Sequence, residues 1–303
     1  INMIKAFLEQ KKTTQSYILE FIENEIDSEE NYEKLIRFIK AQNIIKDTEN
    51  LLAILYLILA ISNNHHRSST FFNKIEKILL YFKEIITKNF SNDFIYIFFQ
   101  ENKRLLLFLI EEHILIIDKN IATKISLKKL DYSSYLFPEI NYFLTLAAKK
   151  KIQRHFNNEN FEEKRKEGVN NDHLSQIIRN DSIEELITYL NKEQLSFSAI
   201  IKTSIFETNS FLIENKKDLS LIKYAAFYGS IQVFKYLHLN GAILDQSIWL
   251  YAIHSNNPEL IYYLHDEIKF LCTNGTLKKM FEESLKCHHN EMANYIENNL
   301  MFK

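Results

Sequence analysis

The residues whose types best suit metal chemistry lie near the C-terminus, in the run KCHHNE at positions 286–291. It offers Cys287, His288, His289 and Glu291, and thiolate, imidazole and carboxylate are all zinc ligands. Neighbouring residues on a helix project about 100° apart, so these four side chains cannot all reach one ion. No Cys-x-x-Cys or His-x-x-x-His pair completes a ligand set. We therefore expect no metal site and no cofactor.

Other histidines occur in pairs. The run NNHHRSS at 63–69 places two adjacent histidines in a polar loop, where we expect them to be solvated. His238 and His265 occupy equivalent positions in two similar segments. Helices pack about 10 Å apart, which is too far for a shared ion. Each of the two is either half-buried and hydrogen-bonded to a backbone group, which we favour, or part of a pH-responsive pair.

Motifs for catalysis or nucleic-acid binding are not found. The chain contains no Gly-x-Ser-x-Gly, no glycine-rich phosphate loop and no His-Glu-x-x-His. Its carboxylates lie beside lysines at the spacing of solvated helix faces. The basic run at 149–155 is followed by the acid-rich run at 159–167, and the formal net charge is -2. The sequence therefore predicts a protein that is not an enzyme and does not bind nucleic acid.

Short paired helices are the elements that position these residues. In YAAFYGSIQVFKYL, 224–237, Gly229 falls where a helix end needs a left-handed residue, and Ser230 can cap the next helix. YAIHSNNPELIYYL, 251–264, matches without a gap, with Asn256 in place of Gly229 and a period of 251 − 224 = 27 residues. Gly241 ends the second helix in the same way. We find weaker copies at 177–190, where Ser182 and Glu185 form a possible capping box, at 283–296 and, loosely, at 96–109.

This pattern resembles the ankyrin repeat. The residues that carry the resemblance are Tyr224-Ala225-Ala226, Gly229, Val233-Phe234 and the run from Leu237 to Ala242. Ser220-Leu221-Ile222-Lys223 departs from the family's Thr-Pro-Leu-His, and the period is shorter than the usual 33 or so. More specifically, the chain is similar to the large trichomonad family of ankyrin-repeat proteins, in which a helical region precedes irregular repeats. The resemblance implies a solenoid that binds a protein on its concave face.

Composition favours an all-α protein, because four glycines and two prolines are too few for a turn-rich β fold. We predict a helical N-terminal domain at 1–153, a polar linker or loop at 154–171 and an ankyrin-like α-solenoid with short, irregular repeats at 172–303. An irregular insertion should occupy 191–217. Two cysteines suggest no disulfide framework, and no apolar run suits a signal peptide or a membrane span. We therefore expect a cytoplasmic location. The chain does not begin with Met and could be a fragment.

The scaffold hypothesis predicts which side chains project from the concave face toward an unknown protein partner: Asp218, Lys223, Phe227, Tyr228, Leu244, Asp245, Gln246, Leu250 and His254. At least one of Phe227 and Tyr228 should be exposed, unless both pack against the insertion. Trp249 should lie in the core. Two alternatives stay open. One is an enzyme or effector active through a pocket within residues 1–150, with the repeats as targeting module. The other is self-association through repeat ends, which the apolar tail at 295–303 favours.

Overall fold

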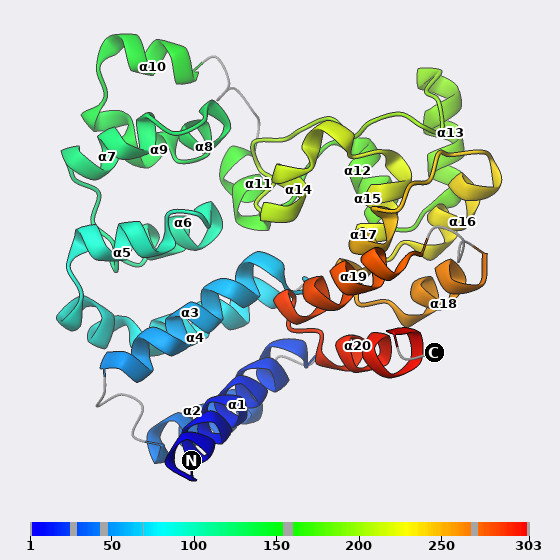
Figure 1. Ribbon diagram of the computed structural model, residues 1–303. Coiled ribbons are helices and arrows are strands. Elements are labelled where there is room, and N and C mark those ends of the chain that lie inside the picture. Colours follow the sequence, from blue (N-terminus) through cyan, green and yellow to red (C-terminus); the bar gives the residue numbers. More distant parts are fainter. Residues whose placement is uncertain are drawn as a thin grey trace. The chain divides into compact units, whose positions relative to one another are not determined.

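The chain is all-α, as predicted. The computed structural model describes residues 2–24, 29–42, 48–68, 70–153, 160–267 and 272–301, with side chains from residue 9 onward. Regular structure in these ranges is helical (Figure 1), and the extended pairing found there is an isolated bridge between Ile200 and Ser220. No helix among the described residues has both the length and the apolar character needed to cross a membrane.

The chain divides into two compact units. The first comprises residues 1–62 and 67–121, and the second comprises 63–66 and 122–303. This division does not coincide with the predicted boundary after residue 153, because residues 122–153 belong to the second unit, where Asp131 pairs with Lys216 at 3.1 Å. The helices of the first unit are α1 (Asn2–Glu23), α2 (Glu29–Ala41), α4 (Phe71–Asn89), α5 (Asn92–Phe99) and α6 (Lys103–Glu111). Two helices cross the division, α3 (Thr48–Asn64) near its end and α7 (Lys119–Ser126).

Side-chain caps begin two of the helices in the first unit. Ser91 Oγ accepts a hydrogen bond from the backbone N–H of Phe94, and Asn102 Oδ1 accepts one from Leu105. These bonds satisfy backbone donors that have no partner inside the helix. The loosely matching segment at 96–109 therefore does form a helix pair, α5 and α6, packed against each other.

The first part of the second unit contains α8 (Leu130–Tyr135), α9 (Phe137–Ile140), the 3-10 turn η2 (Asn141–Phe143), α10 (Leu146–Gln153) and α11 (Phe161–Glu167). Pro138 lies in the first turn of α9, where its missing N–H costs no intrahelical hydrogen bond. The predicted polar linker is wrong over 161–167. There α11 buries Arg165, whose Nη1 and Nη2 bond Glu139 at 2.9 and 2.7 Å. The charged residues that suggested a solvated loop are partly an internal ion pair. Residues 154–159 lie outside the described ranges.

Four helix pairs follow, and Figure 1 shows their first helices in series. The pairs are α12 (His173–Arg179) with α13 (Ile183–Glu193), α15 (Leu221–Tyr228) with α16 (Ile231–Leu239), α17 (Ile248–Ser255) with α18 (Pro258–Glu267), and α19 (Asn274–Lys286) with α20 (Asn290–Tyr295). The first helices α12, α15, α17 and α19 each pack on the next. The starts of α15 and α17 are 248 − 221 = 27 residues apart, which confirms the predicted period. A π-helical turn, η5 (Ile296–Met301), follows α20.

A left-handed residue separates the two helices of every pair. The predicted positions are confirmed at Gly229 (φ 69°) and Asn256 (φ 50°), and the other two turns use Asp181 and His288. Gly241, with φ 83°, follows α16 as predicted. In the second pair Ser230 N–H donates to Ala225 O, the bond that closes a helix end beyond a left-handed residue.

The predicted serine caps are wrong. Neither Ser182 nor Ser230 caps its helix through its side chain. At α16 the carboxylate of Asp181, from the turn of the preceding pair, accepts from Gln232 N–H at 3.1 Å and Val233 N–H at 2.8 Å. An ionised acceptor at a helix N-terminus is favoured over a hydroxyl. The turn of one pair thus caps the second helix of the next.

The predicted irregular insertion at 191–217 begins after α13, which ends at Glu193, and it includes one short helix. It contains α14 (Ser210–Glu214) and, at its end, the 3-10 turn η3 (Lys216–Asp218). Two backbone bonds, Ile201 N to Leu219 O at 2.8 Å and Leu221 N to Ala199 O at 3.1 Å, hold it against the start of α15.

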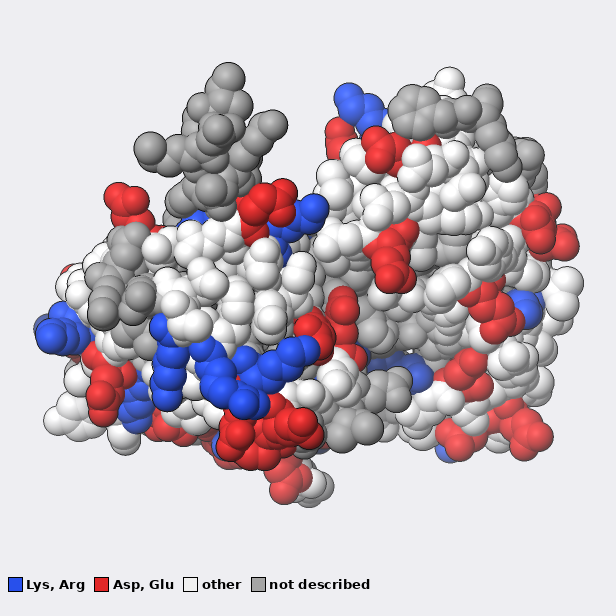
Figure 2. All heavy atoms as spheres, turned by 90° about the horizontal axis from the view of Figure 1, so that it is seen from below, with Lys and Arg blue, Asp and Glu red and all other residues white. Residues whose placement is uncertain are grey.

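On the face of the molecule in Figure 2, the basic side chains near the middle lie directly beside acidic ones.

Candidate functional site

Six of the nine residues predicted to project from the repeats reach solvent. Asp218, Asp245 and Gln246 are exposed, and Tyr228, Leu244 and Leu250 are half-buried. The prediction of a projecting side chain is wrong for Lys223, Phe227 and His254, each less than a tenth exposed. Partner binding by any of the nine stays a prediction. Trp249 is fully buried in the core, as predicted.

Lys223 is buried because two carboxylates hold its ammonium group. Its Nζ bonds Asp218 and lies 2.7 Å from Asp245 Oδ2. Burial lowers the pKa of Lys223, but the two hydrogen bonds outweigh that effect and raise the pKa above its ordinary value. Burial likewise tends to raise the pKa of Asp245, and the bonds from Lys223 and Ser247 bring it below normal. The lysine therefore fixes two exposed carboxylates side by side.

Phe227 is covered by the insertion, which was the predicted alternative for this residue. Its ring stacks on Phe211 of α14 at 6.1 Å and on His254 at 5.1 Å between centroids. Tyr228 is half-buried beside Tyr224, with the guanidinium carbon of Arg179 5.7 Å from its ring centroid. The exposed part of the predicted surface therefore lies mainly around the residues that precede α15 and α17.

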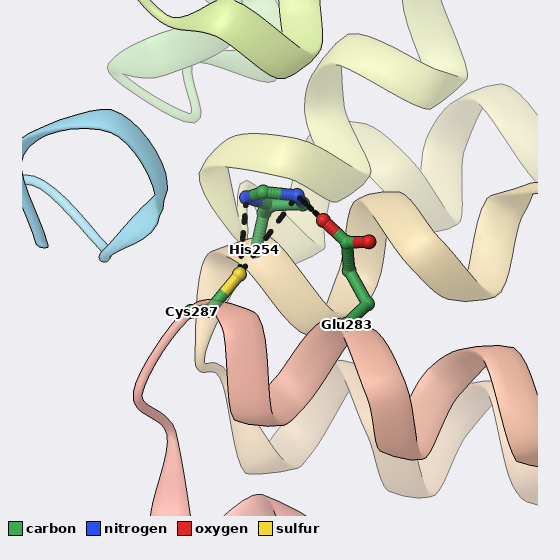
Figure 3. Close-up of side chains that lie close together, drawn as sticks. All are labelled: His254, Glu283 and Cys287. Atoms are coloured by element: carbon green, nitrogen blue, oxygen red, sulfur yellow. Dashed lines mark hydrogen bonds and ion pairs between the residues drawn. The ribbon is translucent and has the colours of Figure 1, made fainter. Parts of the chain in front are cut away.

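A buried cluster of His254, Glu283 and Cys287 joins α17 to α19 (Figure 3). His254 Nε2 donates to Glu283 Oε1 at 2.8 Å. Cys287 Sγ lies 3.5 Å from His254 Nδ1 and 3.9 Å from Nε2, so the sulfur faces the flat side of the ring. Glu283 Oε1 also accepts a hydrogen bond from Lys286 Nζ at 3.1 Å. These donor atoms all lie within 4.8 Å of one another.

Burial controls protonation in this cluster. It lowers the pKa of His254, although the bond to Glu283 opposes the effect. It raises the pKa of the Cys287 thiol, with the Glu283 charge adding to the rise. It also tends to raise the pKa of Glu283, but the partners His254 and Lys286 bring that pKa below normal. Near neutral pH the cluster therefore holds a neutral ring, a protonated thiol and a carboxylate.

Two more histidines pack beside the cluster. His65 Nδ1 donates to the carbonyl of Cys287 at 2.8 Å, and His289 Nδ1 donates to Ile253 O at 2.9 Å. The two rings are 4.8 Å apart. Burial lowers the pKa of His289 to about 2, helped by the neighbouring His65. The expectation of a solvated histidine pair at 65–66 is wrong for His65, because residues 63–66 pack with the second unit.

The sequence did not indicate this cluster, because its candidate ligands were neighbours in a run or equivalent positions in two repeats, and His254 is neither. Glu283 lies in the last turn of α19 and Cys287 is the capping residue that follows the helix, and this spacing of four residues places both side chains on one helix face. That spacing was available in the sequence. The approach of His254 was not, because it depends on α17 packing against α19. His288, His289 and Glu291 do not share in the three-donor group.

The pair at 238 and 265 behaves as ordinary half-buried histidines. His238 Nδ1 shares a hydrogen bond with Tyr263 Oη at 2.8 Å. The partner is a side chain rather than the backbone group that we expected. His265 Nδ1 lies 3.4 Å from Asp266 Oδ1.

Comparisons with known proteins give no relative for this chain. No protein-family model, no curated protein and no solved structure matches it.

Proposed function

We propose that this protein is a non-enzymatic scaffold that binds a protein partner through the exposed ends of its helix pairs. We define the hairpin surface as Asp218, Leu244, Asp245, Gln246 and Leu250. The observation that carries the proposal is the pair of exposed carboxylates fixed by buried Lys223. These carboxylates are held in place beside half-buried leucines, an arrangement that suits a partner with basic and apolar side chains.

The serial packing of helix pairs supports this proposal. In proteins built from stacked repeats, each unit contacts mainly its neighbours, and the connecting segments form one extended surface that is used for binding. The ankyrin resemblance implies the same use. The formal net charge of -2 favours a protein partner over nucleic acid. The free thiols Cys272 and Cys287 support a reducing compartment, the cytoplasm, as the place of action.

The test is capture of partners by the tagged protein from cells that express it, with two charge-matched variants. Gln246→Arg with Leu250→Arg adds two positive charges to the hairpin surface. Gln232→Arg with Tyr262→Arg adds two to the second helices, where both residues are exposed. We expect a partner retained by the wild-type protein and the second-helix variant but lost by the hairpin variant. Equal retention by both variants would refute the hairpin surface as the binding site.

The enzyme alternative has one observation to consider, a cavity of about 200 Å³ in the first unit between α1 and α3. Its lining is Gln10, Lys11, Thr14, Gln15, Asn50, Ala53, Ile54 and Leu57. Lys11 Nζ donates to Asn50 Oδ1, and Thr14 Oγ1 donates to Gln10 O. This lining includes no carboxylate, imidazole or thiol, and its amine, on Lys11, bonds the Asn50 amide rather than a second titratable group of the cavity. The cavity therefore gives the enzyme alternative little support.

A further inference from the structure

We propose that His254 Nε2, Glu283 Oε1 and Cys287 Sγ, which converge between α17 and α19, bind a zinc ion that ties the last two helix pairs together. The ligand set is new relative to the scaffold function and does not depend on it. Nitrogen, oxygen and sulfur donors together are typical of zinc, whereas calcium and magnesium select oxygen donors.

The positions of the donors lie close to what a tetrahedral ion requires. Bonds of about 2.0–2.3 Å at tetrahedral angles place ligand atoms about 3.3–3.8 Å apart. Here Nε2 lies 2.8 Å from Oε1 and 3.9 Å from Sγ. Binding therefore requires the imidazole to turn so that Nε2 points between the carboxylate and the sulfur, which now faces the ring. The backbone is already in place, since Glu283 and Cys287 share one face of α19.

Charge balance favours an ion at this position. His254 and Cys287 are buried, and the side chain of Glu283 is only 15% exposed. The thiol loses its proton to solvent when it binds the metal. The carboxylate and the thiolate then carry two negative charges that offset the two positive charges of zinc, and the imidazole binds as a neutral ligand. The ion and its three ligands are then neutral together, which reduces the cost of burying their charges. Lys286, which bonds the same Oε1 of Glu283 at 3.1 Å, is half-exposed and can turn to solvent when the ion binds.

Neighbouring groups are arranged to support a metal-bound imidazole. A metal-bound histidine usually donates its second ring N–H to a backbone carbonyl or a carboxylate. The backbone of Asn64 hydrogen-bonds the His254 ring, and it would take this role once Nε2 binds the metal and Nδ1 carries the ring proton. The carbonyl of Cys287 is held by His65 Nδ1 at 2.8 Å, which restrains the sulfur-bearing residue. Three protein donors leave the fourth position of a tetrahedral ion for water.

The experiment uses the full chain, treated with chelator and then titrated with cobalt, whose thiolate complexes absorb, and with zinc in competition. We expect one equivalent of cobalt to give thiolate-to-metal absorption, and zinc to displace it. Zinc should also raise the thermal midpoint of the wild-type protein. Magnesium should do neither, because its preferred donors are oxygens.

Two cysteine variants separate this site from chance binding. Cys287→Ser should abolish the thiolate absorption and weaken zinc binding more than about 100-fold, since loss of even an outer partner costs 10–100-fold. Cys272→Ser, at a half-buried cysteine outside the cluster, should keep both. Glu283→Gln, which preserves the side-chain shape, should weaken binding without changing the circular dichroism. If cobalt gives no thiolate absorption, or if absorption survives in Cys287→Ser, the proposal is wrong.

Discussion

Adding one methyl group at Gly229 should destabilise the second unit more than the same change at Gly241. Both glycines have left-handed backbones, with φ of 69° and 83°. Alanine in this conformation costs about 1 kcal/mol at either position. The surroundings differ. A Cβ at Gly229 would lie 3.2 Å from Asn257 Cβ, Asn257 Nδ2 and Ser255 Cβ, whereas a Cβ at Gly241 would meet nothing within 4 Å.

The contact at Gly229 is costly because Asn257 is not free to move. Its Nδ2 donates to Gly229 O at 3.0 Å, and its Oδ1 accepts from Glu259 N–H at the start of α18. Displacing the Asn257 side chain would disturb the packing between the two helix pairs, and an overpacked position of this kind lowers the free energy of unfolding by about 1–3 kcal/mol. We therefore expect a loss of about 2–4 kcal/mol for Gly229→Ala and about 1 kcal/mol for Gly241→Ala.

The assay is urea unfolding followed by the fluorescence of Trp249, the single tryptophan, which is fully buried in α17. The two variants should share the slope of the wild-type transition and differ in midpoint, because the slope reports the surface exposed on unfolding. Equal losses for the two alanines would show that the turn at Gly229 does not press on Asn257. The packing of α15–α16 against α17–α18 would then have to be reconsidered.

Three further predictions concern other contacts of the second unit, each measured by the same urea unfolding. Asp181→Ala should cost about 2 kcal/mol, because it removes the cap of α16 and puts alanine at positive φ, and Asp181→Asn should cost less than about 1 kcal/mol; equal costs would contradict the cap. Lys223→Met should change the free energy of unfolding by no more than about 1 kcal/mol, because the two carboxylates that it leaves face water. Asp218→Ala with Asp245→Ala should lower it by about 3 kcal/mol, because a buried ammonium group is left unpaired. A larger loss in Lys223→Met than in the double variant would contradict this account of the ion pairs. Burial raises the pKa of Tyr224 from 10.0 to about 12. The stability that the protonated tyrosine contributes is therefore fully present below pH 10, and the free energy of unfolding falls as the pH rises, by about 1.4 kcal/mol at pH 11. The free energy of unfolding of Tyr224→Phe should fall correspondingly less between pH 9 and 11, and an equal fall in this variant would exclude Tyr224 as the cause.

Local chemistry made the turns predictable. Gly229 and Asn256 could be read directly, because few residues tolerate a left-handed backbone. Asp181 and His288 take up the same conformation without so clear a signal. The caps were beyond local reasoning, since the acceptor at α16 comes from a turn about 50 residues earlier in the chain. A serine at the right position was outcompeted by a carboxylate that only the stacking of the pairs brings near.

The predicted exposure of three side chains is wrong in a part of the chain that departs from a regular repeat. Lys223, Phe227 and His254 were placed outside by analogy with ankyrin units. Phe211 of the insertion covers Phe227 and lies 4.1 Å from His254 between ring centroids. An insertion of this length has no counterpart in the repeat pattern, so nothing in the period could indicate which face it covers. The same packing makes His254 a buried partner of Glu283 and Cys287 rather than a surface residue.

The constant feature of these helix pairs is the turn rather than the period. Successive left-handed residues at 181, 229, 256 and 288 are 229 − 181 = 48, 256 − 229 = 27 and 288 − 256 = 32 residues apart. Each nonetheless separates two helices in the same way, and the first helices still pack in series. The spacing of 48 contains the insertion at 191–217, which lies between pairs, whereas the spacing of 32 reflects the longer first helix of the last pair, since α19 has 13 residues and α17 has 8. A search for a fixed period finds one strong match and several weak ones in such a chain, and a search for glycine or asparagine at the turn finds two of the four turns, because the other two use Asp181 and His288.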